Sequence, residues 1–68
     1  MKIRLNGEAR EITLDATVHQ MLIDLGLEPA QKGIAVAVDG EMVFRKDWQT
    51  IRLKPESKVE IVRAVAGG

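Results

Sequence analysis

Residues 17–27, TVHQMLIDLGL, form the segment of this chain whose apolar residues follow a helical period. The side chains that share one helical face, at i, i+3, i+4 and i+7, are Val18, Met21, Leu22 and Leu25. Thr17 can accept a hydrogen bond from the first turn, and Gln20 can reach back, as in a capping box. Gly26 suits the left-handed position after the last turn, and Pro29 blocks continuation. We predict a helix of about eight or nine residues, which needs a sheet to lie on.

A hairpin precedes this helix. Residues 1–5 alternate between apolar and charged side chains, the period of a half-buried strand. Asn6-Gly7 follows, and both residue types tolerate the positive φ of a type I′ turn. In the return strand we expect Ile12 and Leu14 to continue the apolar face.

A second hairpin follows the helix. In residues 33–44, GIAVAVDGEMVF, branched apolar residues alternate with alanines up to Asp39-Gly40. This pair favours the same tight turn, and we expect residues 41–44 to form the return strand. The alanine face is semi-apolar, which suits a strand that lies centrally or is covered on both sides.

The rest of the chain completes the sheet. We expect an irregular or single-turn connector at residues 45–50 and a short extended piece at residues 51–53. After a turn at Pro55, we expect the last strand at residues 58–63. This order predicts an α+β fold, with a mixed four- to five-stranded sheet and one main helix packed across one face. The first and last strands can lie side by side in the centre, because enough chain separates them for a crossover.

Composition narrows the classes of partner. The 68 residues include ten basic and ten acidic side chains and no cysteine. A net charge near zero argues against a nucleic acid and against an anionic membrane surface as partners. The charged N-terminal segment is not a signal peptide, and no apolar run is long enough to span a bilayer. We expect one small, soluble, cytoplasmic domain.

The sequence offers no set of catalytic groups. His19 is the single histidine, and a metal would need further nitrogen or sulfur ligands that the chain lacks. Asp24 and Glu28 lie four apart, but a solvated acidic patch is the simpler interpretation than a pair for acid–base catalysis. Trp48 is expected to pack in the core or at the sheet edge. We therefore predict a protein that is not an enzyme, with no bound metal or cofactor.

The last residues carry the functional prediction. We expect a domain at residues 1–63 and a flexible tail at residues 64–68, which ends in two glycines. Two final glycines occur by chance in roughly one chain in two hundred, and a truncation could also produce them. Five extended residues span up to about 17 Å. Since Ala66 is small and glycine has no Cβ, Ala66 and Gly67 can thread a narrow channel, and the carboxyl carbon of Gly68 is open to attack once it is activated.

These features resemble the ThiS family of sulfur carriers in the ubiquitin-like β-grasp superfamily. The resemblance covers almost the whole chain, and its segments are MKIRLNGEAR, TVHQMLIDLGL, GIAVAVDGEMVFRKDW and VEIVRAVAGG. Two positions depart from the family pattern. Asp39 stands where Asn is common, which a type I′ turn accepts equally, and Phe44 stands where Pro is frequent.

The resemblance implies a mechanism and its partners. An ATP-dependent activating enzyme adenylates the carboxylate of Gly68, so ATP is used by the partner and not bound by this chain. A persulfide protein then supplies sulfur, AMP leaves, and a thiocarboxylate forms. Thiazole synthase takes the sulfur for the thiazole of thiamine.

Ile61 and Val62 are neighbours in a strand, so one of them must face away from the helix. We therefore hypothesise that Phe44, Val62 and Val65 help to dock the activating enzyme.

Three other interpretations stay open. The small subunit of molybdopterin synthase shares the β-grasp fold and the Gly-Gly end. A ubiquitin-like tag joined to lysines would also end in this way. A third possibility is a ubiquitin-like interaction module with an idle tail, such as an RNA-binding or scaffold domain, although the neutral charge speaks against RNA.

Overall fold

The first hairpin forms where the sequence places it. In the computed structural model, which describes residues 1–64, β1 (Lys2–Leu5) and β2 (Glu8–Glu11) pair antiparallel. Asn6 and Gly7 connect them with φ of 48° and 88°. These positive values are those of a type I′ turn, so the predicted turn is confirmed.

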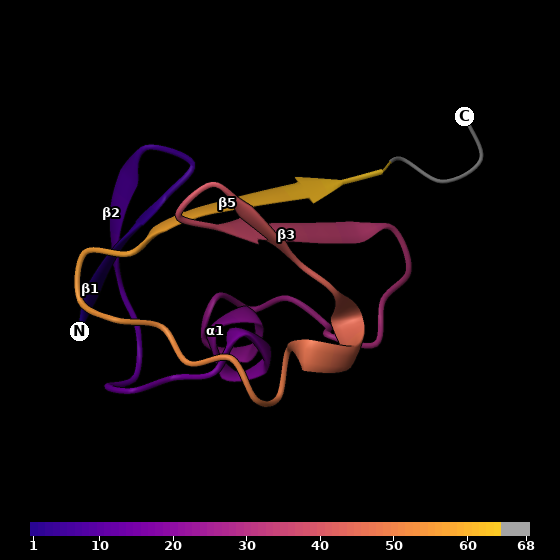
Figure 1. The fold of residues 1–68 in the computed structure, drawn as a ribbon, viewed down its shortest axis with the longest axis horizontal. Helices are drawn as coiled ribbons and strands as arrows, with labels where there is room; N and C mark the ends of the chain where they lie inside the picture. Colours follow the sequence, from indigo (N-terminus) through magenta and orange to yellow (C-terminus); the bar gives the residue numbers. More distant parts are fainter. Residues whose placement is uncertain (65–68) are drawn as a thin grey trace.

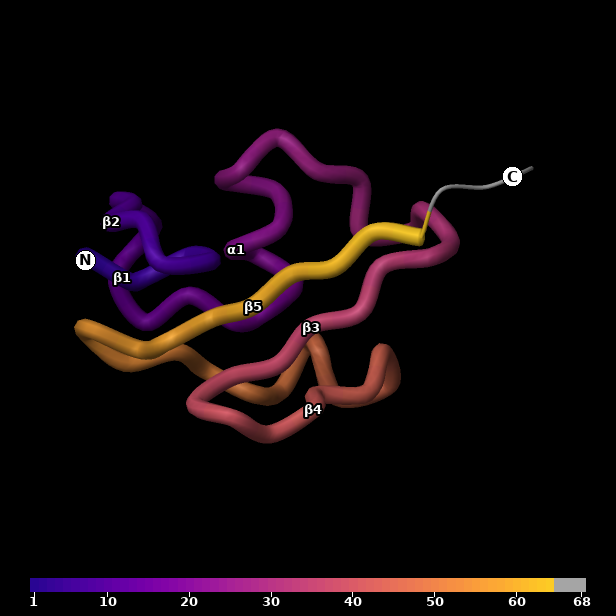
Figure 2. The backbone as a smooth tube through the Cα atoms, turned by 90° about the horizontal axis from the view of Figure 1, so that it is seen from above, coloured from indigo at the N-terminus to yellow at the C-terminus, as the bar shows by residue number. Residues whose placement is uncertain are grey.

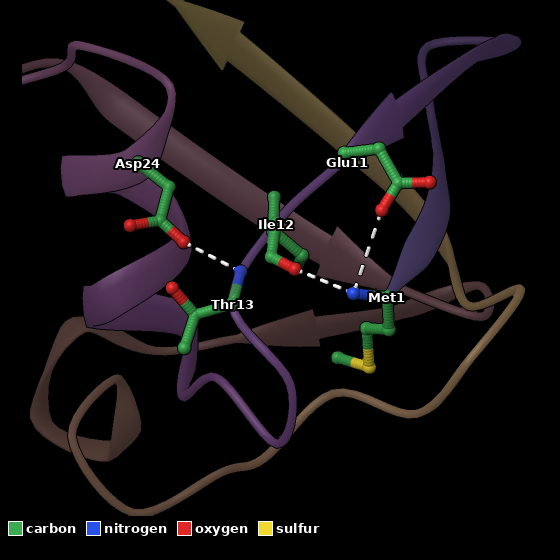
Figure 3. Close-up of polar contacts among 5 residues, drawn as sticks. All are labelled: Met1, Glu11, Ile12, Thr13 and Asp24. Carbon is green, nitrogen blue, oxygen red and sulfur yellow. Dashed lines mark hydrogen bonds and ion pairs between the residues drawn. The ribbon is translucent and has the colours of Figure 1, made fainter.

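The return strand ends earlier than predicted. β2 stops at Glu11, and Ile12 is buried as expected, but Leu14 is 68% exposed. Our expectation that Leu14 continues the apolar face is therefore wrong. Ile12 donates its N–H to the Met1 carbonyl at 2.9 Å. Its own carbonyl accepts from the Met1 ammonium at 2.6 Å, as Figure 3 shows. These bonds are the last of the hairpin, and the chain then turns away from the sheet.

The helix α1 (Val18–Asp24) starts at the predicted cap. The Thr17 hydroxyl accepts from the Gln20 N–H at 3.1 Å. The second half of the expected capping box is wrong, because the Gln20 side chain donates forward to the Asp24 carboxylate at 2.8 Å. A charged acceptor one turn along the same face is a stronger partner than the cap backbone.

The end of α1 is fixed by a left-handed glycine. Gly26 has a φ of 79°, and its N–H donates to Ile23 at 2.9 Å. Leu27 donates to Leu22 at 2.8 Å, so the two bonds make a Schellman motif. The predicted helix end is confirmed, although α1 has seven residues instead of eight or nine.

The second hairpin consists of β3 (Ile34–Val38) and β4 (Glu41–Val43), joined by the predicted Asp39-Gly40 turn. β4 ends one residue before Phe44, where the prediction placed the strand end. The single-turn connector is the short 3₁₀ helix η1 (Arg45–Asp47).

The last strand, β5 (Lys58–Arg63), lies in the middle of the sheet. It pairs parallel with β1 and antiparallel with β3, which gives the order β2-β1-β5-β3-β4. Figure 2 shows β5 running between the two hairpins. The predicted central pairing of the first and last strands is confirmed. The extended piece at residues 51–53 makes a single bridge, from Arg52 to Thr17.

The core lies between α1 and the sheet (Figure 1). Trp48 is 3% exposed and donates its indole N–H to the Val43 carbonyl at 2.9 Å, so its expected place in the core is confirmed. The side chains buried almost completely are Ile3, Val18, Met21, Leu22, Val36, Leu53 and Val59. Within residues 1–64, α1 covers one face of the sheet and no helix or strand covers the other.

Candidate functional site

The uncovered face of the sheet carries apolar side chains along β3, β4 and β5. Val62 of β5 is 64% exposed, whereas its neighbour Ile61 is half-buried against the core. The expectation that one of this pair faces away from the helix is therefore confirmed. Phe44 is 64% exposed and follows β4 directly.

The strand register gathers these side chains into one patch. Val62 pairs with Ala35, and Ala37 pairs with Met42, which is 59% exposed. Residues that pair directly on neighbouring strands have side chains on the same face, about 5 Å apart. We call Ala35, Met42, Phe44 and Val62 the apolar patch. Exposed apolar surface of this kind, gathered in one place, is typical of a contact surface for another protein.

Sequence reasoning missed Met42. The signal was present, because Val43 and Met42 alternate along β4, and Val43 packs inward against the core. A period of two then places Met42 on the outer face. Its partner Ala37 exposes little apolar area of its own, so the patch is visible only once the three strands are in register.

Charged residues occupy the other half of the same face. Arg4 of β1 pairs with Lys58 of β5, and Glu60 lies two residues further along β5. An open groove lies here, lined partly by Asn6 and Gly7 of the first turn. The outer face therefore divides into an apolar half beside the end of β5 and a charged half beside its start.

The predicted carrier residues follow directly on this patch. The structure describes the chain as far as Ala64, whose N–H donates to the Gly33 carbonyl at 2.7 Å. The predicted positions Val65, Ala66, Gly67 and Gly68 lie outside the described residues. The segment therefore begins directly after Ala64, two residues beyond Val62 of the apolar patch.

The carboxylate of Asp24 has a structural role that the sequence did not reveal. Its carboxylate accepts from the Thr13 N–H at 2.8 Å and so ties α1 to the segment before it (Figure 3). It also accepts from the Gln20 side chain at 2.8 Å. The bond from the Thr13 backbone, followed by that from Gln20, lowers the pKa of Asp24 below its ordinary value of 3.8. An ionised carboxylate held in this way is a structural acceptor, not half of an acid–base pair.

His19 lies beside Trp48, where its backbone N–H donates to the Trp48 carbonyl at 2.9 Å. Its side chain is half-buried and lines a shallow hollow with Pro29 and Arg45.

Among residues 1–64, no three His, Asp or Glu side chains come together as a metal site. In the same part of the chain, no helix is both long and apolar enough to cross a membrane.

A five-stranded mixed sheet with a central parallel pair and one helix across one face is the ubiquitin-like β-grasp fold. The predicted fold is confirmed. The match to a crystal structure of the thiamine biosynthesis protein ThiS from Geobacter metallireducens has a TM-score of 0.82, with 23% identity and full coverage of both chains. A solution structure of a thiamine biosynthesis protein from the same organism matches with a TM-score of 0.81, also at 23% identity, and the match covers all of this chain and 88% of that one.

The chain belongs to the ThiS family, whose model matches residues 3–68. It is 28% identical to the sulfur carrier protein ThiS of Escherichia coli K12, over the full length of both. It is also 31% identical, over all of its 68 residues, to part of a thiazole synthase from Magnetococcus marinus. This chain spans only 20% of that protein and 20% of a similar thiazole synthase from Paramagnetospirillum magneticum.

Proposed function

We propose that this chain carries sulfur in the formation of the thiazole of thiamine, with the carboxylate of Gly68 as the carrier group. The observation that carries the proposal is the family match, which extends through Gly67 and Gly68. The full-length similarity to the E. coli sulfur carrier supports it further. The chain acts as a cosubstrate that is loaded and unloaded in each cycle, and not as a catalyst.

The loading chemistry follows from the weak reactivity of a carboxylate. One oxygen of Gly68 attacks the α-phosphorus of ATP, pyrophosphate leaves, and an acyl adenylate forms. A persulfide then attacks the carboxyl carbon and displaces AMP. A thiol finally cleaves the sulfur–sulfur bond, which leaves a thiocarboxylate on Gly68 and a disulfide on the donor side.

The apolar patch is the proposed docking surface for the activating enzyme. Phe44 and Val62 were expected in this role, and Met42 and Ala35 extend it. Val65, the third expected docking residue, lies outside the described residues. The patch lies next to the start of the segment that ends in Gly68, so docking there would bring the carboxylate toward the enzyme.

Thiazole synthase is the proposed acceptor of the sulfur. Two proteins of that name each contain a segment similar to the whole of this chain. In each of them, a segment similar to this chain is part of a protein named as a synthase. This arrangement supports a direct transfer of sulfur from the carrier to the synthase. The donor is proposed to be a persulfide-bearing protein, because this chain has no cysteine of its own.

Reconstitution tests the proposal. The loaded protein is supplied as the sole sulfur source to thiazole synthase and, in parallel, to a molybdopterin synthase large subunit. We expect thiazole formation and no molybdopterin. Molybdopterin formation alone would assign the chain to the other pathway, and isopeptide-linked adducts on lysines would make it a protein tag. Full thiazole formation by a variant that lacks Gly67 and Gly68 would favour an interaction module with an idle tail.

A further inference from the structure

The strongest unexplained contact in the structure lies where the chain leaves the sheet. The register of β3 and β5 ends at the pair Ile34 and Arg63. One further bond follows, from the Ala64 N–H to the Gly33 carbonyl at 2.7 Å, which is among the shortest backbone hydrogen bonds outside the helix and the strands. The chain is therefore held for one residue beyond the end of β5, by the residue that immediately precedes β3.

Gly33 can hold Ala64 in this way because it has no side chain. A Cβ added to Gly33 would lie 3.2 Å from the Ala64 carbonyl oxygen and 3.4 Å from the Ala64 Cβ. Gly7 and Gly40 have nearly the same φ, +88° and +86° against +84° for Gly33, yet an added Cβ would meet nothing within 4 Å at either position. At Gly33 an added Cβ would therefore be tight against Ala64 as well as strained by the backbone angle, whereas at Gly7 and Gly40 it would be strained by the backbone angle alone.

The segment that carries Gly33 is itself fastened to the core. Arg45 donates from one guanidinium nitrogen to the Gln31 carbonyl at 2.8 Å and from the other to the Pro29 carbonyl. Its guanidinium carbon lies 4.4 Å from the centre of the Trp48 ring, which is buried. Arg45 therefore ties the loop before Gly33 to the connector after β4, and Gly33 is a fixed support.

We infer that Gly33 is a positioning residue for the loading reaction, which fixes where and in which direction the carrier segment leaves the domain. This inference rests on the proposed function. With Ala64 held, four residues follow it, and an extended four-residue segment reaches at most about 14 Å. We call the bond between Ala64 and Gly33 the clamp. The docking residue Val62 is only two positions before it, so the clamp sets an upper limit to the distance from the docked surface to the reacting carboxylate.

Loss of the clamp acts on the reaction and not on docking. Val62 and Met42 come before the bond between Ala64 and Gly33 and keep their places in the sheet, so we expect the docking contacts that they provide to be unchanged. The released chain samples more directions, and a smaller fraction of docked complexes places the carboxylate at ATP. Because a misplacement of about 1 Å can cost about 100-fold in rate, we expect a fall of kcat of at least about tenfold.

The test compares Gly33→Ala with Gly7→Ala and Gly40→Ala. All three variants force alanine into the same left-handed region, but only at Gly33 would the new Cβ press on Ala64, 3.2 Å from its carbonyl oxygen, so that Ala64 has to shift by a few tenths of an ångström. ATP–pyrophosphate exchange with the activating enzyme gives kcat and KM. We expect a lower kcat at unchanged KM for Gly33→Ala, and wild-type values for the two controls. Amide hydrogen exchange at Ala64 should be slow in the wild type and in the controls, and fast in Gly33→Ala.

A second pair of variants keeps the test decisive if Gly33→Ala does not fold. Ala64→Pro removes the donor of the bond to Gly33, whereas Ala64→Ser keeps it, and both leave the strand pairs intact. We expect the same fall of kcat for Ala64→Pro and none for Ala64→Ser. Equal kcat in the variants of either comparison would overturn the inference. Failure of the wild type to be adenylated at all would instead count against the proposed function, while exchange at Ala64 would still test the clamp.

Discussion

The side-chain amide of Asn6 makes two hydrogen bonds with the backbone of Ile61. Its nitrogen donates to the Ile61 carbonyl at 3.2 Å, and its oxygen accepts from the Ile61 N–H at 3.0 Å. The amide thus takes the place of a strand residue and continues the pairing of β1 with β5 where β1 has already turned. On the other side of β5, Asp39 acts similarly, since its carboxylate accepts from the Lys58 N–H at 2.9 Å. The first residue of each tight turn therefore holds the central strand.

Loss of the Asn6 amide should destabilise the sheet. Asn6→Gly keeps the left-handed backbone but removes both bonds. We expect it to lower the free energy of unfolding by about 1–3 kcal/mol. Asn6→Ala should lower the free energy of unfolding by about 1 kcal/mol more than Asn6→Gly does, because alanine is strained at a φ of 48°. Urea unfolding followed by Trp48 fluorescence measures both. A stability of Asn6→Gly equal to that of the wild type would show that the two bonds contribute nothing net.

The Asp24 carboxylate should make stability depend on pH in acid. Its pKa is lowered in the folded protein by the bonds from Thr13 and Gln20, so its contribution is present above the ordinary value of 3.8 and is lost as the pH falls through the folded pKa. Asp24→Asn should therefore lower the free energy of unfolding at about pH 7, and the difference from the wild type should shrink as the pH falls through the folded pKa. The loss should stay below about 1 kcal/mol, because the group is exposed and screened by solvent.

Glu28→Gln is the matched control for Asp24. Among residues 1–64, the bonds from Thr13 and Gln20 go to Asp24 and not to Glu28, so Glu28→Gln should lower the free energy of unfolding at about pH 7 less than Asp24→Asn does. A difference in the free energy of unfolding between the wild type and Asp24→Asn that stays the same at every acidic pH would contradict the structural role of this carboxylate.

The apolar patch should govern affinity for the activating enzyme. We expect Met42→Asp, Phe44→Asp and Val62→Asp each to raise KM for the carrier at least about tenfold, since burying a charge in place of a central apolar contact costs more than about 1.4 kcal/mol. The kcat at saturation should change little. Steady-state adenylation with folded variants, checked by circular dichroism, measures this.

Leu14→Asp is the control for the patch. Among residues 1–64, Leu14 is the most exposed of the large apolar residues, at 68%, but it lies in the turn before α1. Its substitution should leave KM unchanged. Adenylation that is unaffected in Val62→Asp and Phe44→Asp would place the docking surface elsewhere.

The elements that the sequence predicted best are those with a local cause. Asn6-Gly7 and Asp39-Gly40 specify tight turns through their own φ preferences, and Gly26 ends α1 in the same way. Leu14 was misplaced because a two-residue period was extended past the point where β1 can still offer a partner.

The features that the sequence did not reveal are contacts between distant residues. The sequence assigned Gly33 no particular role, and its contact with Ala64 exists only after β3 and β5 have paired. Met42 joined the apolar patch for the same reason. The bonds from Arg45 to Pro29 and Gln31 depend on the path of a loop that no periodicity describes.

The central claim is that the carboxyl group of Gly68 receives the sulfur, and intact-mass spectrometry tests it most directly. The protein is incubated with ATP, its organism's adenylating enzyme and a persulfide donor, and the E. coli sulfur carrier with its own enzyme serves as the positive control. We expect the mass gain of one oxygen replaced by one sulfur, located by fragmentation on Gly68 and absent from a variant with a C-terminal amide. An unchanged mass beside a loaded positive control, or sulfur located on any other residue, would contradict the account.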